Sequence, residues 1–310
     1  MPRWRPSALL LAAIAVAGPS ARAFESGSID SGGLARSYAI EVPERSGSVE
    51  RMPLVIVLHG AGGQGTTAMR SYRWDATAKR GGFIAVAPDA APAFLDRPAD
   101  FRTNPRYWND GSGRGPAGHL RVDDVAFLAQ LIDVLAARYP IDRGRVYATG
   151  FSSGASMTHR LGIELSDRLA AIAPVAGKAW VLTSPKRTLP VLFLVGESDP
   201  LTPLNGGPVK LPWGGEQTYP PARELPEAWA SLDHCQAPSA IEQPLAQMTL
   251  RAWRVCADGA EVLFYTVAGL GHEWAGGAGR LLPEAMTGPY SDAVDTTELI
   301  WKFFRRHRRK

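Results

Sequence analysis

Cysteine is scarce in this chain of 310 residues, which contains only Cys235 and Cys256. Two thiols with no histidine spaced to join them argue against a metal site, and we expect neither a metal nor a cofactor. In an exported protein, an even pair of cysteines is typical of one disulfide. We therefore predict a Cys235–Cys256 bond that closes a loop of about 20 residues, which stabilises the fold by about 3 kcal/mol in the chain-entropy description.

Long apolar runs are also missing beyond the N-terminus, which argues against a membrane span in the rest of the chain. The N-terminus itself carries Arg3 and Arg5, an apolar segment over 8–18, and a small-x-small site at 21–23. This order predicts a signal peptide over 1–23, with an uncleaved N-terminal anchor as the alternative. The mature chain would then begin near Phe24, in the periplasm or outside the cell.

The body of the chain lacks a strong excess of either charge. The formal net charge is +4, and the predicted signal peptide accounts for three arginines and no acids. Residues 305–310 contribute five more positive charges, so the part between them is mildly acidic. A basic tail of this kind can contact nucleic acid or anionic surfaces, but short tails are more often solvated and frayed. We expect a solvated tail and no nucleic-acid partner.

Internal repeats and linkers are absent as well, so residues 24–310 are expected to form one domain. Apolar or alternating runs predict strands, and helical spacing predicts helices between them. The expected strands are 38–43, 54–58, 83–87, 145–148, 169–176, 190–195 and 261–267, and the expected helices are 67–80, 123–139, 153–165, 223–233 and 292–304. Strands that alternate with helices predict an α/β fold, with a mostly parallel central sheet and helices on both faces.

A Gly-x-Ser-x-Gly pattern occupies 150–154, between an expected strand and an expected helix. This layout is typical of a nucleophile elbow, a sharp turn that holds a serine hydroxyl above a sheet. Side chains at Gly150 or Gly154 would collide with neighbouring backbone in so tight a turn. The register of the pattern favours Ser152 as the nucleophile over Ser153 or Ser156.

An acid and a base follow later strands in the order that this pattern requires. Ser152, Asp199 and His272 each come directly after an expected strand. The carboxyl ends of parallel strands meet at one sheet edge, so these three side chains are expected to converge there. His272 would take the serine proton, and Asp199 would orient and stabilise the imidazolium. Asp199 as a plain turn residue before Pro200 is the alternative.

A glycine-rich loop, 59–63, follows the buried strand at 54–58. No Gly-Lys-Ser/Thr continuation is present, which argues against a phosphate-binding P-loop. We expect the backbone N–H groups of Ala61 and Ser153 to form an oxyanion hole, in which one donor typically lowers the barrier by about 3 kcal/mol. His59 in this loop suits loop structure better than general-base chemistry.

Two long polar loops, 90–121 and 201–226, are expected near the same sheet edge. Loops of this length are usually functional or mobile. Trp108 in the first loop and Trp274 after the last strand would be placed to bind an apolar acyl chain or a phenolic ring. Packing within the loops is the alternative role for both.

These motifs together resemble the secreted polyhydroxybutyrate depolymerase-like and feruloyl esterase (LpqC-type) family. The matching segments are 58–63, 108–111, 123–128, 147–157, 164–168, 171–177 and 271–274. The resemblance implies an α/β-hydrolase fold, a serine esterase with Ser152, Asp199 and His272 as its triad, and a disulfide between the two late cysteines. The chain departs from the family after the nucleophile, where Ser153-Gly154-Ala155 replaces Asn-Gly-Gly, and after His272, where Ala275 replaces proline.

The resemblance and the motifs lead to one main hypothesis and two alternatives. The main hypothesis is a secreted serine carboxylesterase that acts on hydroxyalkanoate oligoesters, or on hydroxycinnamoyl or acetyl esters of plant polysaccharide. Soluble oligomers and small esters are expected rather than crystalline polyester, since no polymer-binding module is apparent. The alternatives are a secreted peptidase on the same fold and a catalytically inactive binding protein.

Overall fold

The computed structural model describes residues 24–44, 50–113, 115–119, 122–211, 214–237, 239–242, 247–280 and 282–310. The predicted signal peptide, 1–23, lies outside these residues. No helix in the described ranges is both long enough and apolar enough to cross a bilayer.

A single large sheet runs through the middle of the described chain. Its ten strands lie in the order β1-β2-β4-β3-β7-β8-β9-β14-β13-β12. They are β1 Glu25–Ser31, β2 Leu34–Glu41, β3 Met52–Leu58, β4 Ile84–Pro88, β7 Ile141–Phe151, β8 Ala171–Val175, β9 Val191–Gly196, β12 Ser239–Glu242, β13 Met248–Trp253 and β14 Val262–Val267. The strands from β4 to β14 are parallel, and those outside them pair antiparallel. The predicted mostly parallel sheet is confirmed.

The antiparallel strands at the two edges include three that the sequence patterns did not predict. β1 is largely polar and half exposed, as expected of a strand that is covered on one side only. β13 and β12 extend the sheet beyond β14, which the sequence had suggested was the last strand. Edge strands bury less apolar surface than central ones, so their hydrophobic signal is weaker.

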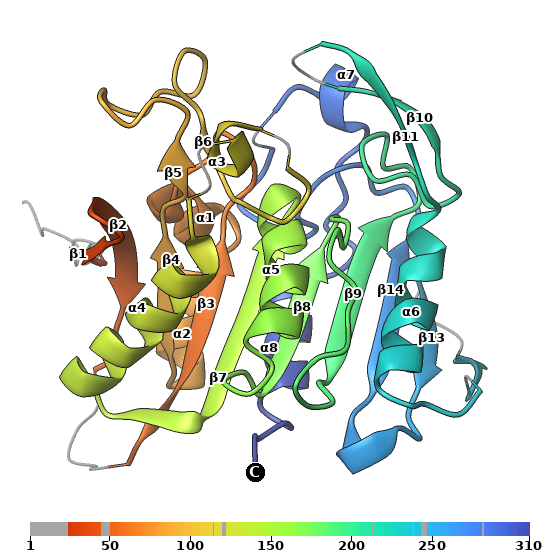
Figure 1. The fold of residues 1–310 in the computed structure, drawn as a ribbon. Coiled ribbons are helices and arrows are strands. Elements are labelled where there is room, and N and C mark those ends of the chain that lie inside the picture. The colour runs from red at the N-terminus through yellow and green to blue at the C-terminus, as the bar shows by residue number, and fades with distance from the viewer. Residues whose placement is uncertain are drawn as a thin grey trace, which may run out of the picture.

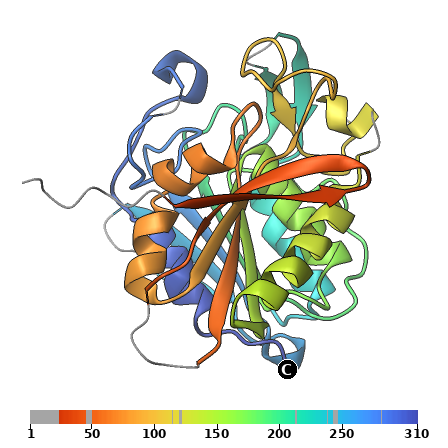
Figure 2. The ribbon, with the colours of Figure 1, turned by 90° about the vertical axis from the view of Figure 1, so that its left-hand side faces the viewer.

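Helices cover both faces of the sheet, as predicted (Figure 1). One face carries α4 Asp124–Arg138, α5 Ser153–Glu164 and α6 Leu225–Leu232, and the other carries α1 Gly65–Ser71, α2 Trp74–Gly81 and α8 Thr296–Phe304. Figure 2 views the sheet along its β1–β2 edge, with the two helix layers on either side. The core accordingly consists of two apolar clusters, one for each face of the sheet.

Local sequence explains where the main helices begin and end. Asp123 caps α4 by accepting a hydrogen bond from the backbone N–H of Ala126, and Asp295 caps α8 in the same way. Pro140 follows the end of α4, as expected of a residue that cannot continue a helix. The single helix predicted over 67–80 is wrong: Arg73 adopts a left-handed conformation with φ 62° and divides it into α1 and α2.

Short elements form a cap over the carboxyl ends of the parallel strands, at the top of Figure 1. They are β5 Ala91–Pro92, β6 Arg106–Tyr107, α3 Gly115–His119, β10 Gly207–Lys210, β11 Glu216–Tyr219 and α7 Glu284–Thr287. The two long loops expected from the sequence thus contain regular structure of their own. Two short 3-10 turns, Ala222–Glu224 and Ala257–Gly259, complete the described elements.

The basic C-terminal tail is held against the body of the protein, so the expectation of a frayed end is wrong. The carbonyl of His307 accepts a hydrogen bond of 2.6 Å from Tyr147, and the N–H of Arg309 donates to the carbonyl of Gly144. Arg306 pairs with Glu261 at 2.8 Å. Acidic side chains on the body of the protein pair with the basic residues of the tail and hold it in place. These partners lie far from the tail in the sequence, so the sequence of the tail alone does not predict the contact.

The predicted disulfide between Cys235 and Cys256 is present. It joins the segment after α6 to the segment after β13. Backbone hydrogen bonds flank it, from Gln236 to Val255 and from Ala257 to Asp233. The bridge therefore ties a helix on one face to the antiparallel edge of the sheet.

Candidate active site

The turn from β7 into α5 has the geometry of a nucleophile elbow. Ser152 adopts φ 55° and ψ −118°, a strained conformation for a residue with a side chain. An added Cβ at Gly150 would lie 2.4 Å from the carbonyl oxygen of Gly154. One at Gly154 would lie 2.3 Å from the carbonyl oxygen of Leu58. The expected collisions at both glycines are therefore present.

The structure brings Ser152, His272 and Asp199 into one hydrogen-bonded chain. His272 Nε2 lies 2.8 Å from Ser152 Oγ, and His272 Nδ1 lies 2.8 Å from Asp199 Oδ2. The Asp199 side chain is fully buried and that of His272 is nearly so. With Nδ1 protonated toward the carboxylate, Nε2 is free to accept the hydroxyl proton, as general-base chemistry requires.

The acid and the base are each fixed by the backbone around them. Asp199 Oδ1 accepts hydrogen bonds from the N–H groups of Leu201 and Thr202, at 2.8 and 2.7 Å. The N–H of His272 donates to the carbonyl of Thr287 at 2.5 Å, which ties the histidine loop to α7. Asp199 therefore does both things that the sequence offered as alternatives: its side chain stabilises the turn before Thr202, and it also contacts His272.

The glycine loop after β3 is braced by the long loop above it. Trp108 Nε1 donates to the carbonyl of His59 at 2.9 Å, and the N–H of Gly62 donates to the carbonyl of Arg106 at 2.8 Å. Ala61 lines both cavities described below, together with Ser152, whereas Ser153 lines the second cavity only. Both residues expected to form the oxyanion hole thus lie beside Ser152.

His59 is locked into this loop as a neutral side chain. Its Nδ1 lies 2.7 Å from the carbonyl of Gly60, and its Nε2 accepts from the N–H of Ala90 at 3.0 Å. Burial lowers the pKa of His59 to about 4, so the ring is uncharged near neutral pH. Both ring nitrogens are engaged, which agrees with a role in loop structure.

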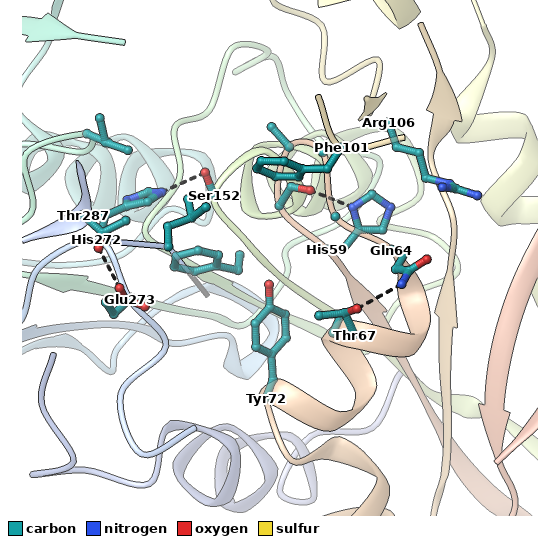
Figure 3. A pocket seen from close by; sticks show the side chains of 18 of the residues that line it. His59, Gln64, Thr67, Tyr72, Phe101, Arg106, Ser152, His272, Glu273 and Thr287 are labelled. Atoms are coloured by element: carbon teal, nitrogen blue, oxygen red, sulfur yellow. Dashed lines mark hydrogen bonds between the residues drawn. The ribbon is translucent and has the colours of Figure 1, made fainter. Parts of the chain in front are cut away.

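Two cavities meet at the Ser152 hydroxyl and share Ala61, Leu201 and His272 in their walls. The first has a volume of about 420 Å³ and is bordered by apolar and aromatic side chains, among them Tyr72, Phe101 and Phe151 (Figure 3). The second measures about 630 Å³ and has a similar mixture of apolar and polar walls, with aromatic side chains such as Tyr107 and Trp108 beside hydroxyl and charged groups. An ester bound across the serine would place one half in each cavity.

Comparison with known proteins agrees with this geometry. Residues 36–202 match the family described as "Esterase PHB depolymerase". The chain is also 31% identical over 287 residues to the putative esterase NocK of Nocardia uniformis, an alignment that covers 84% of this chain and 74% of NocK. The chain belongs to the PHB depolymerase esterase family.

Other relatives share shorter segments. A feruloyl esterase B of Piromyces equi is 30% identical over 169 residues, covering 51% of this chain and 30% of that protein. A poly(3-hydroxyalkanoate) depolymerase C of Paucimonas lemoignei is 30% identical over 132 residues, covering 43% and 29% of the two chains. The chain thus spans about a third of the length of these two relatives.

Solved structures support the α/β-hydrolase fold expected of this esterase family. An acetyl xylan esterase from Aspergillus awamori superposes with a TM-score of 0.57 at 15% identity, over 90% of this chain and 99% of that one. A thermostable esterase superposes with a TM-score of 0.56 at 15% identity, over 92% and 63% of the two chains. At this identity the likeness concerns the fold alone.

The two tryptophans expected to contact substrate both take part in packing. Trp108 is 2% exposed, braces the glycine loop and reaches the wall of the second cavity. Trp274 is 4% exposed, donates to Thr297 Oγ1 at 3.0 Å and is not among the residues that line either cavity. It stacks on Tyr72 with ring centroids 4.4 Å apart. Trp274 therefore supports the first cavity indirectly, by packing behind Tyr72, which lines it.

Tyr72, Phe101 and Glu273 are among the residues of the first cavity that were not singled out from the sequence. Tyr72 falls inside the predicted helix over 67–80, where nothing marks it as facing the site. Phe101 is one apolar residue in a long polar loop, and Glu273 follows His272 without a role of its own in the triad pattern. Burial raises the pKa of Glu273 above its usual range, and a hydrogen bond from Thr287 partly offsets the shift.

The Trp-Asn-Asp-Gly segment at 108–111 has a structural partner in α4. The buried carboxylate of Asp124 accepts from the N–H of Asn109 at 2.7 Å and pairs with Arg36 at 2.6 Å. Arg160 in α5 donates to the carbonyl of Asn109. The segments 108–111 and 123–128, which both match the family pattern, are therefore hydrogen-bonded to each other and hold the loop over the sheet.

Proposed function

We propose that this chain is a serine carboxylesterase that works through an acyl-enzyme on Ser152. The observation that supports this most directly is the unbroken chain of contacts from Ser152 Oγ through His272 to Asp199. An ordinary serine hydroxyl is a weak nucleophile at neutral pH and needs a base at this distance. Membership of an esterase family makes an ester carbonyl the natural target.

The reaction follows from the positions of these groups. His272 accepts the proton as Ser152 Oγ attacks the ester carbonyl, and Asp199 stabilises the imidazolium. The N–H groups of Ala61 and Ser153 are proposed to hold the oxyanion. His272 then protonates the departing alcohol, which leaves an acyl group on Ser152. In the second half of the reaction His272 takes a proton from water, the water attacks the acyl-enzyme, and the carboxylic acid is released as the Ser152 hydroxyl is restored.

The proposed substrates are esters of the kinds named for the relatives. Feruloyl esterase, acetylxylan esterase and poly(3-hydroxyalkanoate) depolymerase are the activities named for three of them. We propose hydroxyalkanoate oligoesters, or feruloyl and acetyl esters of plant cell walls, as substrates. The disulfide and the N-terminal pattern favour an exported protein that acts in the periplasm or outside the cell.

A serine replacement tests the mechanism. Purified protein should hydrolyse p-nitrophenyl butyrate and react once with a fluorophosphonate, which loses fluoride and adds its phosphonyl group to the peptide that contains Ser152. Ser152→Ala should lose both hydrolysis and label, with a fall in kcat of about 10³-fold or more. Ser231→Ala, which replaces an exposed serine of α6 outside both cavities, is the control and should keep both.

The possible outcomes separate the competing functions. Hydrolysis that survives Ser152→Ala would refute the assigned nucleophile. Wild-type protein that takes neither ester nor label would favour an inactive binding protein. Cleavage of peptides in preference to esters would favour a peptidase on the same fold.

A further inference from the structure

Glu273 is a buried acid that the triad mechanism does not use. It directly follows His272, it is 4% exposed, and it belongs to the residues that line the first cavity beside Ser152. Burying a carboxyl group costs free energy unless other groups compensate. A buried acid next to a general base is therefore a candidate for a part in the reaction.

Thr287 holds this carboxylate and the general base together. Its hydroxyl donates to Glu273 Oε1 at 2.7 Å, and its carbonyl accepts from the N–H of His272 at 2.5 Å. Thr287 is itself buried and lines the same cavity. Figure 3 shows the bonded pair of Thr287 and Glu273 beside His272. One residue of α7 thus fixes both the histidine loop and the carboxylate, so their relative position is set by the fold.

Charged groups from other segments also act on Glu273. Arg280 attracts the carboxylate, whereas Asp199 repels it. The Arg280 side chain is partly exposed and pairs with Glu284 at 3.2 Å, so its charge is shared between two acids and screened by solvent. The protonated form of His272 is a second cation that attracts the carboxylate. This proton is present only for part of the catalytic cycle.

Two phenols, Tyr72 and Tyr290, interact electrostatically with Glu273 as well. Burial raises the pKa of both phenols above their usual range. Both are therefore neutral near pH 7, where a serine esterase works. They add no charge that changes while a proton moves between Ser152 and His272.

We propose that the ionised Glu273 carboxylate is a positioning residue for His272, which stabilises the imidazolium that forms as Ser152 attacks the ester. This inference rests on the proposed esterase function and adds a residue to its proton transfer. The serine proton still passes to His272 Nε2, and Glu273 neither gives nor takes one. Because the imidazolium is absent from the resting enzyme, its stabilisation lowers the barrier without tightening substrate binding.

Two replacements separate the charge of Glu273 from its shape. Glu273→Gln keeps an oxygen for the Thr287 hydroxyl and removes the charge, whereas Glu273→Asp keeps the charge and shortens the side chain. Asp292→Asn is the matched control. It removes an exposed acid from the segment that follows α7, outside both cavities.

The experiment measures kcat/KM for p-nitrophenyl acetate from about pH 5 to about pH 9, because the profile of an uncharged ester reports the ionisations of the free enzyme. A negative charge favours the protonated base, so Glu273→Gln should move the acid limb by about half a pH unit or more toward lower pH. Its kcat/KM on the plateau should fall about two- to tenfold, since the imidazolium loses stabilisation. Glu273→Asp and Asp292→Asn should keep the acid limb within about 0.2 pH unit of the wild type.

The position of the acid limb does not depend on how much of the protein is folded, so a less stable variant still gives a result. A Glu273→Gln limb at the wild-type position would show that the carboxylate does not act on His272. Equal shifts in Glu273→Gln and Glu273→Asp would show that packing of the side chain, and not its charge, is responsible. Failure of the proposed function itself would appear separately, as acetate hydrolysis that survives Ser152→Ala.

Discussion

At the scale of single residues, the site depends on positions where a side chain has no room. Ser152 is held in a strained conformation between Gly150 and Gly154, both of which pack closely against the end of β3 at Leu58. Gly154 is the tightest of these contacts, with the carbonyls of Leu58 and His59 at 2.3 and 2.5 Å from an added Cβ. Ser152 is thus positioned by close approach of α5 to β3.

Gly154→Ala should therefore damage both the fold and the reaction. The methyl group forces α5 away from the glycine loop, which we expect to lower the free energy of unfolding by about 1–3 kcal/mol and kcat/KM by more than about tenfold. Urea unfolding and p-nitrophenyl ester hydrolysis measure the two effects.

The control for this change is Gly33→Ala, in the turn between β1 and β2. Gly33 has φ 77° but no atom within 4 Å of an added Cβ, so its replacement strains the backbone without moving the site. It should reduce stability and leave kcat/KM unchanged. A Gly154→Ala protein with wild-type kcat/KM would contradict the close-approach argument.

At the scale of elements, Asp233 connects three parts of the chain at the end of α6. Its Oδ1 accepts from the N–H of Leu189 before β9 at 2.9 Å, and its carbonyl accepts from Ala257 beside the disulfide. The carboxyl group is fully buried, and Oδ2 has no hydrogen-bond partner within the described chain. Burial raises the pKa of Asp233 to about 7, although the Leu189 N–H and the charge of Arg187 oppose the shift.

This shift predicts how stability changes with pH. In the unfolded chain the carboxyl releases its proton near pH 4, whereas in the folded protein it keeps the proton until about pH 7. Stability should therefore fall as pH rises from about 4 to about 7 and level off above that, with a total loss of at most on the order of 4 kcal/mol.

Asp233→Asn removes the titration and keeps an oxygen for the Leu189 N–H. We expect its urea midpoint to vary less between pH 4.5 and pH 7.5 than the wild-type midpoint does. Asp258→Asn, in the nearby 3-10 turn, serves as an exposed control and should follow the wild-type profile. Parallel profiles for wild type and Asp233→Asn would show that this group does not control the pH dependence.

At the scale of the whole molecule, the parallel strands hold the site residues, whereas the antiparallel strands extend the edges of the sheet. The carboxyl ends of β3, β7, β9 and β14 carry the glycine loop, Ser152, Asp199 and His272, so the parallel centre assembles the site. The β13–β12 edge extends the sheet on one side, and the disulfide ties it to α6.

Removing that bridge should reduce stability. The double variant Cys235→Ser and Cys256→Ser should lose about 3 kcal/mol in urea unfolding, because the unfolded chain is no longer held in a loop of 21 residues. A reductant should lower the wild-type midpoint toward that of the variant and leave the variant unchanged. Equal midpoints for the oxidised wild type and the variant would contradict a stabilising role.

The sequence alone determined the α/β alternation, the elbow serine, and the acid and base that follow later strands. These features are local: each depends on a short run of residues and on the strand that precedes it. The buried strands were found for the same reason, since strands covered on both faces are continuously apolar. The disulfide was predictable because only one pairing of two cysteines exists.

Only the tertiary structure decided which side chains face the cavities and what holds them. Trp108 packs against the glycine loop and also lines the second cavity, and Trp274 packs behind Tyr72, while Tyr72 and Phe101 came to the first cavity from a predicted helix and a polar loop. The anchored tail and the polar edge strand β1 depend likewise on partners distant in the sequence. The physical reason is that orientation and contact are set by packing between distant segments, which no local pattern of residues records.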